Sequence, residues 1–157
     1  MLFHPGAGRQ KEGMSFRFLD HTADIGVEVE GATLADLFQQ GAAALLSLLT
    51  DYAAVTASIA REIHIEGADP TDLWINYLRE ILYLFNGEGF FVREVGEMTF
   101  APSAAAAAGF LLTARCRGET YDPRRHLLAT EVKAVTYHHA EVTETPGGWR
   151  GVFIVDV

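Results

Sequence analysis

Residues 20–31 have the sequence DHTADIGVEVEG, in which a polar motif leads directly into a strand pattern. Apolar side chains occupy every second position from Ile25 to Val29, and polar side chains or glycine occupy the positions between them. This alternation predicts a half-buried strand over 25–30 with one face in water, which Gly31 ends. Upstream, Phe16 and Phe18 alternate in the same way, so a first short strand over 15–19 is expected to run into the motif.

An amphipathic helix is predicted after Gly31. Thr33 is a typical N-cap residue, and Asp36 stands three positions later, where a capping box usually has Glu or Gln. From Leu34 to about Thr50 the apolar residues recur at spacings of three and four, so one face is expected to be buried. Gly41 costs about 1 kcal/mol relative to alanine in such a helix, and the close approach of a neighbouring element would explain its presence.

A second helix is predicted from Asp69-Pro70 to about Phe85. Asp69 serves as the cap and Pro70 occupies the first helical position, while Gly87 and Gly89 are expected to terminate the helix. The apolar stripe of this helix is wide, which predicts that it is covered on more than one side.

The remaining strand patterns fix the predicted fold class. They cover residues 57–66, 90–100, 109–118, 131–144 and 149–155, with a hairpin loop at 103–108 and a turn at 146–148. We therefore expect an α+β fold, with a mixed or antiparallel sheet of about six or more strands packed against two long amphipathic helices. Residues 1–14 are expected to form a mobile N-terminal tail and residues 15–157 a single domain.

Composition narrows the functional classes. The chain has 157 residues and a formal net charge of −9, which argues against binding nucleic acid through the whole surface and suits a cation or a basic partner. Cys116 is the only cysteine, so no intramolecular disulfide forms and a reducing, cytoplasmic setting is expected. No secretory signal and no run of about 18 apolar residues is present, so export and membrane insertion are not expected.

The motif at 20–26 concentrates oxygen ligands. The carboxylates of Asp20 and Asp24 flank His21, and an even spacing places the two carboxylates on the same side of an extended segment. Hard cations such as calcium take about 6–8 oxygen ligands, so two carboxylates alone are insufficient. Asp156 and the α-carboxylate of Val157 follow an apolar run and could complete the set. The alternative is that Asp20 caps a turn and Asp24 is merely solvated.

The strand predicted over 131–144 carries further polar side chains. Regular alternation places Glu131 and Lys133 on one face, where they could form an ordinary surface ion pair. The same alternation sends His138 and His139 to opposite faces, which argues against a zinc site built from this pair. The basic residues of the chain concentrate at Arg115, Arg117, Arg124, Arg125 and His126, which could contact a phosphate or an acidic partner, or could be scattered solvated charges.

Three segments together resemble the archease family: DHTADIG at 20–26, EVKAVTYH at 131–138 and the terminal Asp156-Val157. The resemblance extends over roughly residues 16–157. It implies a protein cofactor without catalytic residues of its own, which assists the GTP-dependent RNA ligase that joins 3′-phosphate to 5′-hydroxyl ends in tRNA splicing and RNA repair. The cofactor would promote guanylylation of the ligase's active-site histidine and permit multiple turnover, and it would reach RNA only through the ligase.

The resemblance also implies roles for individual residues. Asp24, Asp156 and Val157 match the family's metal site, with calcium the expected cation, although magnesium and manganese suit the same oxygen ligands. Partner-facing or supporting roles are expected for the remaining polar residues of the motifs, namely Asp20, His21, Lys133, His138 and His139. Two other functions stay open: a free-standing metal-dependent phosphoester hydrolase that uses Asp20, His21 and Asp24, and a chaperone-like protein-binding module in which the acidic residues only solubilise the chain.

Overall fold

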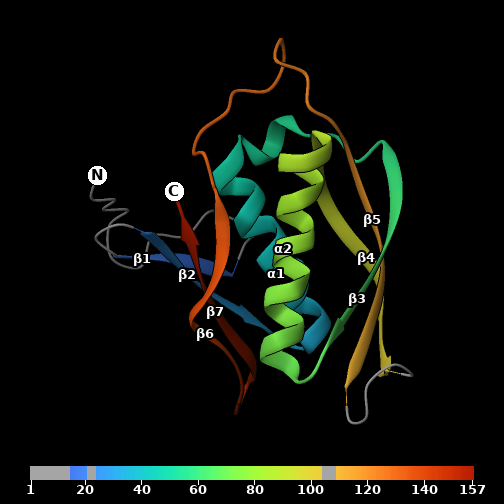
Figure 1. Ribbon diagram of the computed structural model, residues 1–157, viewed down its shortest axis with the longest axis vertical. Coiled ribbons are helices and arrows are strands. Elements are labelled where there is room, and N and C mark those ends of the chain that lie inside the picture. The colour runs from blue at the N-terminus through green and yellow to red at the C-terminus, as the bar shows by residue number, and fades with distance from the viewer. Residues whose placement is uncertain (1–14, 21–23, 104–108) are drawn as a thin grey trace.

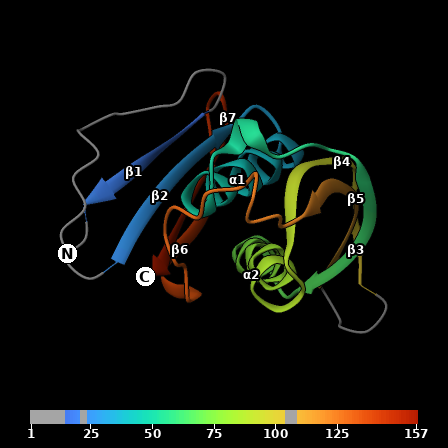
Figure 2. The same cartoon turned by 90° about the horizontal axis from the view of Figure 1, so that it is seen from above.

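The fold consists of two antiparallel sheets with two helices between them (Figures 1 and 2). The structure is a computed structural model that describes residues 15–20, 24–103 and 109–157. Its elements are β1 (Phe16–Asp20), β2 (Asp24–Gly31), α1 (Leu34–Leu49), the short 3-10 helix η1 (Tyr52–Ala54), β3 (Ile59–Gly67), α2 (Pro70–Glu88), β4 (Phe90–Pro102), β5 (Phe110–Thr120), β6 (Ala134–Thr145) and β7 (Gly148–Asp156). The α+β fold class is confirmed. The predicted tail at 1–14 lies outside the described residues.

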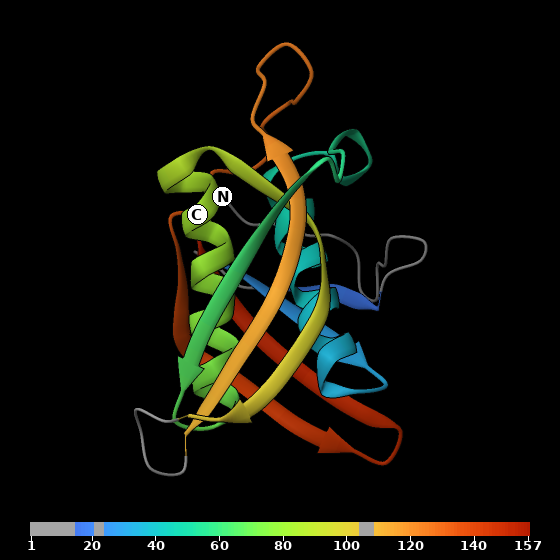
Figure 3. The ribbon, with the colours of Figure 1, turned by 90° about the vertical axis from the view of Figure 1, so that its right-hand side faces the viewer.

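The strands divide between the two sheets in a way that the sequence did not indicate. One sheet has the order β1-β2-β7-β6 and the other β3-β5-β4 (Figure 3), and every neighbouring pair is antiparallel. Both helices contact both sheets, since α1 packs on β2 and β4 while α2 packs on β6 and β3. This arrangement confirms that the wide apolar stripe of α2 is covered on more than one side.

Aromatic side chains from both helices and from β7 meet at the centre of the core. Phe38 of α1 packs against Trp74 and Tyr77 of α2 with ring centroids 5.2 and 4.9 Å apart, and Trp74 also contacts Phe153 of β7. The polar atoms of these rings are paired, because Trp74 donates to the carbonyl of Val152 and Tyr77 donates to the carbonyl of Phe38. A Cβ at Gly41 would lie 2.5 Å from the Trp74 ring, which confirms the close approach expected at this glycine.

The helix boundaries agree with the capping signals except at one end. Thr33 accepts a hydrogen bond from the Asp36 N–H, and Asp69 accepts one from the Asp72 N–H. The prediction that α2 ends near Phe85 is wrong, because the helix continues through Glu88. Gly89 alone forms the C-cap, with φ of 66° and its N–H bonded to the Phe85 carbonyl at 2.8 Å.

The expected wet face of β2 is present only in part: Glu30 is exposed, but Glu28 is not. Glu28 is only 9% exposed, and its carboxylate accepts hydrogen bonds from Arg17 of β1 at 2.6 Å and from Arg150 of β7 at 2.7 Å. Burial raises the pKa of Glu28, but these two hydrogen bonds outweigh it and leave the pKa below its ordinary value. The charge is buried because β2 is an inner strand, with a partner on each side.

The strand predicted over 131–144 begins later and is irregular. β6 starts at Ala134, and a register shift against β7 interrupts it between Thr136 and Glu141. Val132 and Val135 are both buried although their positions differ in parity, so the predicted alternation of faces is wrong here. None of the helices in the described ranges is long and apolar enough to cross a membrane.

Candidate functional site

The ladder between β2 and β7 places Asp24 directly opposite Asp156. The two strands are antiparallel, and Asp24 and Asp156 are the pair at the end of the register. Side chains of such a cross-strand pair lie on the same face, with Cβ atoms about 4.5–5.5 Å apart. Asp24 is half-buried, Asp156 is exposed, and the adjacent Val157 is 41% exposed. Two carboxylates from distant parts of the sequence are therefore neighbours at an accessible end of the β2–β7 ladder.

These two carboxylates have no cationic partner within the described ranges. Like charges placed directly opposite each other in a ladder destabilise it, so the pair suits a cation more than it suits a bare sheet. Calcium, magnesium and manganese prefer carboxylate and carbonyl oxygen, which is the chemistry that Asp24 and Asp156 offer. A complete group of three acidic, His or Cys ligands is not found in the part of the chain that the structure describes.

Lys133 lies beside this pair. Its backbone N–H donates a 2.8 Å hydrogen bond to the backbone carbonyl of Asp156, and the next residue, Ala134, is the register partner of Asp156 in β6. The side chain of Lys133 is exposed. Lys133 is therefore a neighbour of Asp156, whereas Asp24 lies on the other side of β7; the partner-facing role of Lys133 stays a prediction.

The other motif residues lie differently. The backbone of Asp20 ends β1 opposite Ile25, and residues 24–26 of the motif begin β2. The side chain of Asp20 and all of His21 fall outside what the structure describes. His138 and His139 lie four and five residues beyond Ala134, and no group of three metal-ligating side chains is found among the described residues, as there would be if either histidine joined Asp24 and Asp156. The two histidines are therefore not part of the carboxylate pair.

The two histidines also correct an expectation. Their rings do not point to opposite faces: the ring centroids are 4.0 Å apart. His139 has a positive φ of 56°, and it sits within the register shift of β6, so the pleat that would separate the two side chains is broken.

Helix α2 fixes the chain between Val132 and Tyr137. Asn86 donates to the Val132 carbonyl and Arg79 donates to the Val135 carbonyl, each at 3.0 Å. The hydroxyl of Tyr137 donates to Asp72, and the Arg79 guanidinium lies 4.6 Å from the centre of the Tyr137 ring. The hydrogen bond raises the pKa of Tyr137 and lowers that of Asp72.

This polar face of α2 was missed by the sequence reasoning. Asp72 and Arg79 are seven residues apart, which is about two helical turns and places them on the same face of the helix. This spacing was the signal in the sequence that could have revealed the polar face. A groove of about 420 Å³ runs along it, lined by Arg79, Leu82, Tyr83, Asn86, Lys133, Ala134 and Val135. Two residues of this lining, Lys133 and Ala134, also adjoin the backbone of Asp156, although neither aspartate lines the groove itself.

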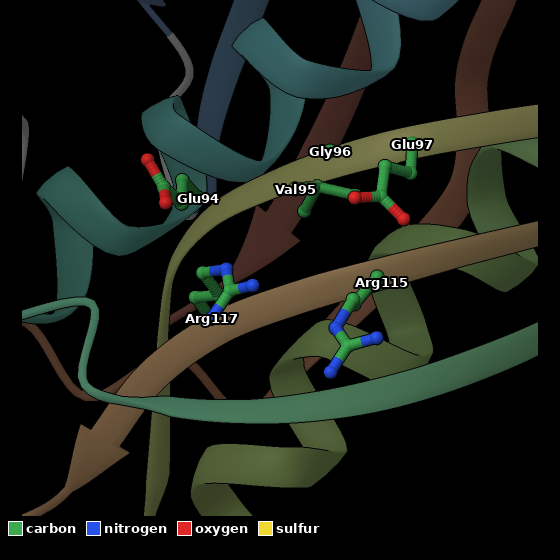
Figure 4. Close-up of a pocket in the computed structure, with 6 residues that line it drawn as sticks. All are labelled: Glu94, Val95, Gly96, Glu97, Arg115 and Arg117. Carbon is green, nitrogen blue, oxygen red and sulfur yellow. The ribbon is translucent and has the colours of Figure 1, made fainter.

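The predicted basic concentration separates into two places. Arg115 and Arg117 line a shallow pocket of about 210 Å³ on the outer face of the three-stranded sheet, together with Glu94 and Glu97 of β4 (Figure 4). The pocket therefore carries both signs of charge. The other members, Arg124, Arg125 and His126, lie beyond the end of β5 and contact Asp122 or Glu119. The five residues do not form one basic patch.

Comparison with known proteins identifies the family. The sequence model of the Archease protein family (MTH1598/TM1083) matches residues 16–157. The chain belongs to the archease family. The protein archease of Methanosarcina barkeri is 33% identical over 93% of this chain and 98% of its own length. The protein archease of Methanopyrus kandleri is 36% identical over 92% of this chain and its whole length.

Solved archease-like structures support the fold. The solution structure of Methanobacterium thermoautotrophicum protein 1598 superposes with a TM-score of 0.76 at 28% identity, covering 91% of this chain and 99% of that chain. A crystal structure from Thermotoga maritima, described as an archease and possible chaperone, gives a TM-score of 0.54 at 16% identity, with coverage of 95% and 98%. The second likeness supports the fold alone.

Proposed function

We propose that this chain is a metal-binding protein cofactor that activates a GTP-dependent RNA-splicing ligase by promoting its guanylylation and multiple turnover. Membership of the archease family supports a cofactor role. The observation that carries the metal assignment is the cross-strand pair of Asp24 and Asp156, which lacks a basic partner within the described residues. The ligase itself and its use in tRNA splicing or RNA repair come from the family resemblance of the sequence motifs.

The proposed ligands are Asp24, Asp156 and the α-carboxylate of Val157. The β2–β7 ladder orients the two side chains, and the Lys133 N–H holds the backbone of Asp156 in place. Asp156 and Val157 are exposed, so a partner protein can approach them. A bound calcium, magnesium or manganese ion would supply positive charge next to the phosphates of GTP when the ligase is guanylylated.

The test follows covalent transfer of labelled GMP to the ligase of the same organism. Adding the wild-type chain should increase the rate and the number of turnovers. Asp24→Asn and Asp156→Asn should abolish the stimulation, because each removes a charged ligand while it keeps the side-chain shape. Glu144→Gln is the matched control: it neutralises an exposed carboxylate at the far end of the β6–β7 hairpin, opposite Trp149, and should stimulate normally. Full stimulation by both aspartate variants would refute the proposal.

A second experiment addresses Val157. Residues added after Val157 convert its α-carboxylate into a peptide bond, so calcium affinity measured by calorimetry should fall. Unchanged affinity would remove this group from the ligand set and leave the two aspartates.

A chaperone-like binding module is the second candidate, because the Thermotoga maritima protein that shares this fold is described as a possible chaperone. In that case the chain would suppress aggregation of the ligase without affecting the rate of guanylylation, and both aspartate variants would act like the wild type. Hydrolysis of phosphoester substrates by the chain alone would instead indicate a free-standing hydrolase.

A further inference from the structure

The loop between β5 and β6 exposes two adjacent leucines. We use the name leucine loop for residues 122–130. Leu127 is 81% exposed and Leu128 is 55% exposed, the highest values among the large apolar side chains described. Single exposed apolar residues are common on protein surfaces. Two adjacent ones are more informative when the backbone that carries them is held in place.

One side of the leucine loop is fixed by a buried carboxylate. Glu119, which is 7% exposed, accepts hydrogen bonds from the Thr56 N–H at 2.6 Å, from His126 at 3.1 Å and from Arg125. His126 is 1% exposed, and its Nδ1 accepts the Asp122 N–H at 2.9 Å. The proton of the neutral ring therefore lies on Nε2, which donates it to Glu119. The residue before Leu127 is thus buried and oriented from two sides.

The other side is fixed by the end of α1. The hydroxyl of Thr50 donates to the Leu127 carbonyl at 2.7 Å. The N–H groups of Ala129 and Thr130 donate to the carbonyls of Leu49 and Leu48, at 2.9 and 3.0 Å respectively. A helix leaves its last carbonyls without partners inside the helix, so the leucine loop completes the C-terminus of α1. Moving the loop would leave these carbonyls unpaired.

The loop also presents a cation. The side chain of Arg124 is 91% exposed, and its nearest acidic group is the Asp122 carboxylate at 3.6 Å. Because the backbone is already ordered, burying the two leucines against a partner would cost little further conformational entropy. A surface that fits has an apolar cleft for the leucines and a carboxylate at its rim for Arg124.

The leucine loop is close to the proposed metal site. Leu128 is five residues before Lys133, whose N–H bonds to the Asp156 carbonyl, so Leu128 lies at most about 18 Å along the chain from the residue that adjoins Asp156. Figure 1 shows the chain passing from the end of β5 to the start of β6, beside which the C-terminus lies. An interface of about 800 Å² per partner would cover both places.

We infer that Leu127, Leu128 and Arg124 dock this chain on the same RNA ligase that the Asp24–Asp156 pair activates, in an apolar cleft with an acidic rim. This inference rests on the proposed function. It separates two tasks: the leucine loop supplies affinity for the ligase, and the carboxylate pair supplies the stimulation once the complex has formed.

The test titrates the chain into the ligase of the same organism with GTP and follows labelled guanylyl-ligase. The double variant Leu127→Ser/Leu128→Ser should raise the concentration for half-maximal stimulation about tenfold or more, with the same maximum. Arg124→Glu, at a side chain almost fully in water, should raise it as well. Phe110→Ser is the matched control, because Phe110 is 37% exposed at the opposite end of β5, and its half-maximal concentration should equal that of the wild type.

Three results would overturn the inference. The first is an unchanged half-maximal concentration for both loop variants while the wild type stimulates. The second is an equal shift in the Phe110→Ser control. The third is a wild-type dimer that sediments as a monomer after the double leucine substitution, since the leucines would then contact a second copy. If the wild type itself fails to stimulate the ligase, the proposed function falls and this inference falls with it.

Discussion

Two acidic centres of this fold differ in how their charge is balanced. Glu119 lies under the leucine loop and is surrounded by the donors Thr56, Arg125 and His126. Asp24 and Asp156 face each other across the β2–β7 ladder, with no basic partner in the ranges that the structure describes. The Glu119 carboxylate already accepts hydrogen bonds from its neighbours and so stabilises the fold. The Asp24 and Asp156 carboxylates lie at an accessible end of the ladder without a basic partner, so their charge is available for a cation. The two centres therefore differ both in charge balance and in burial, since Glu119 is buried whereas Asp156 is exposed.

The largest effect on the free energy of unfolding is expected from removing Glu119. Glu119→Ala removes a buried carboxylate and leaves His126 and the Thr56 N–H without their acceptor. We expect the free energy of unfolding to fall by about 3 kcal/mol, measured by urea denaturation. Asp24→Ala should change it by about 0.5 kcal/mol or less in the absence of metal. Equal losses in the two variants would contradict the distinction between the centres.

The pH dependence of stability tests the same centre without a large perturbation. Burial raises the pKa of Glu119, but the hydrogen bonds from Thr56, His126 and Arg125 outweigh it and lower the pKa from 4.5 to about 2. A folded-state pKa below the unfolded one stabilises the protein above pH 4.5, and this contribution is lost as the pH falls from 4.5 toward 2. The lowered pKa values of Glu28 and Asp72 add to the loss in the same direction.

Glu119→Gln isolates the contribution of one group. The difference in unfolding free energy between wild type and this variant should be constant above about pH 5 and should shrink as the pH is lowered through 4.5. A difference that stays the same from pH 7 to pH 3 would show that the Glu119 charge is not stabilised in the folded state.

The proposed metal site should respond to calcium. If the ion binds only the folded state, calcium at about one hundred times its dissociation constant raises the free energy of unfolding by about 2.7 kcal/mol. Thermal unfolding with calcium and with a chelator measures this difference. The difference should vanish in Asp24→Asn and persist in Glu119→Gln, so a gain that survives in Asp24→Asn would place the cation elsewhere.

The smallest expected change in the free energy of unfolding tests directly whether Asp24 and Asp156 repel each other. In metal-free buffer, Asp156→Asn removes the repulsion between two like charges in a cross-strand pair, so the free energy of unfolding should rise by about 0.5 kcal/mol. Urea denaturation at low ionic strength measures it. A loss of stability instead would indicate that Asp156 has a stabilising partner.

Local signals in the sequence predicted much of the fold. The caps at Thr33 and Asp69 and the close contact at Gly41 depend on residue types within a few positions or on a single glycine, and all three are confirmed. The division into two sheets and the burial of Glu28 were not predictable in this way. The carboxylate of Glu28 is balanced by Arg17, 11 residues away, and by Arg150, 122 residues away, and no local pattern records such pairings.

The candidate site was likewise predictable from the sequence only in part. Asp24 of the motif and Asp156 are register partners, while a metal site built from them stays a prediction. The position of the histidines was predicted wrongly, because an alternation rule assumes regular pleating and the register shift after Thr136 breaks it. The leucine loop had no periodicity to detect, since its order comes from hydrogen bonds to α1 and from Glu119.

The pairing of β2 with β7 also affects how the chain can fold during synthesis. β2 is complete after residue 31, but the side of β2 that pairs with β7 has no partner strand until residues 148–156 are present. Until then the nascent chain carries an open strand edge, of the kind that invites pairing with other chains. Because domains are made from the N-terminus onward and long-range pairings form slowly, the four-stranded sheet can close only after residues 148–156 have left the ribosome. The Asp24–Asp156 pair and the complete sheet would then form in one step, because the same two strands build both.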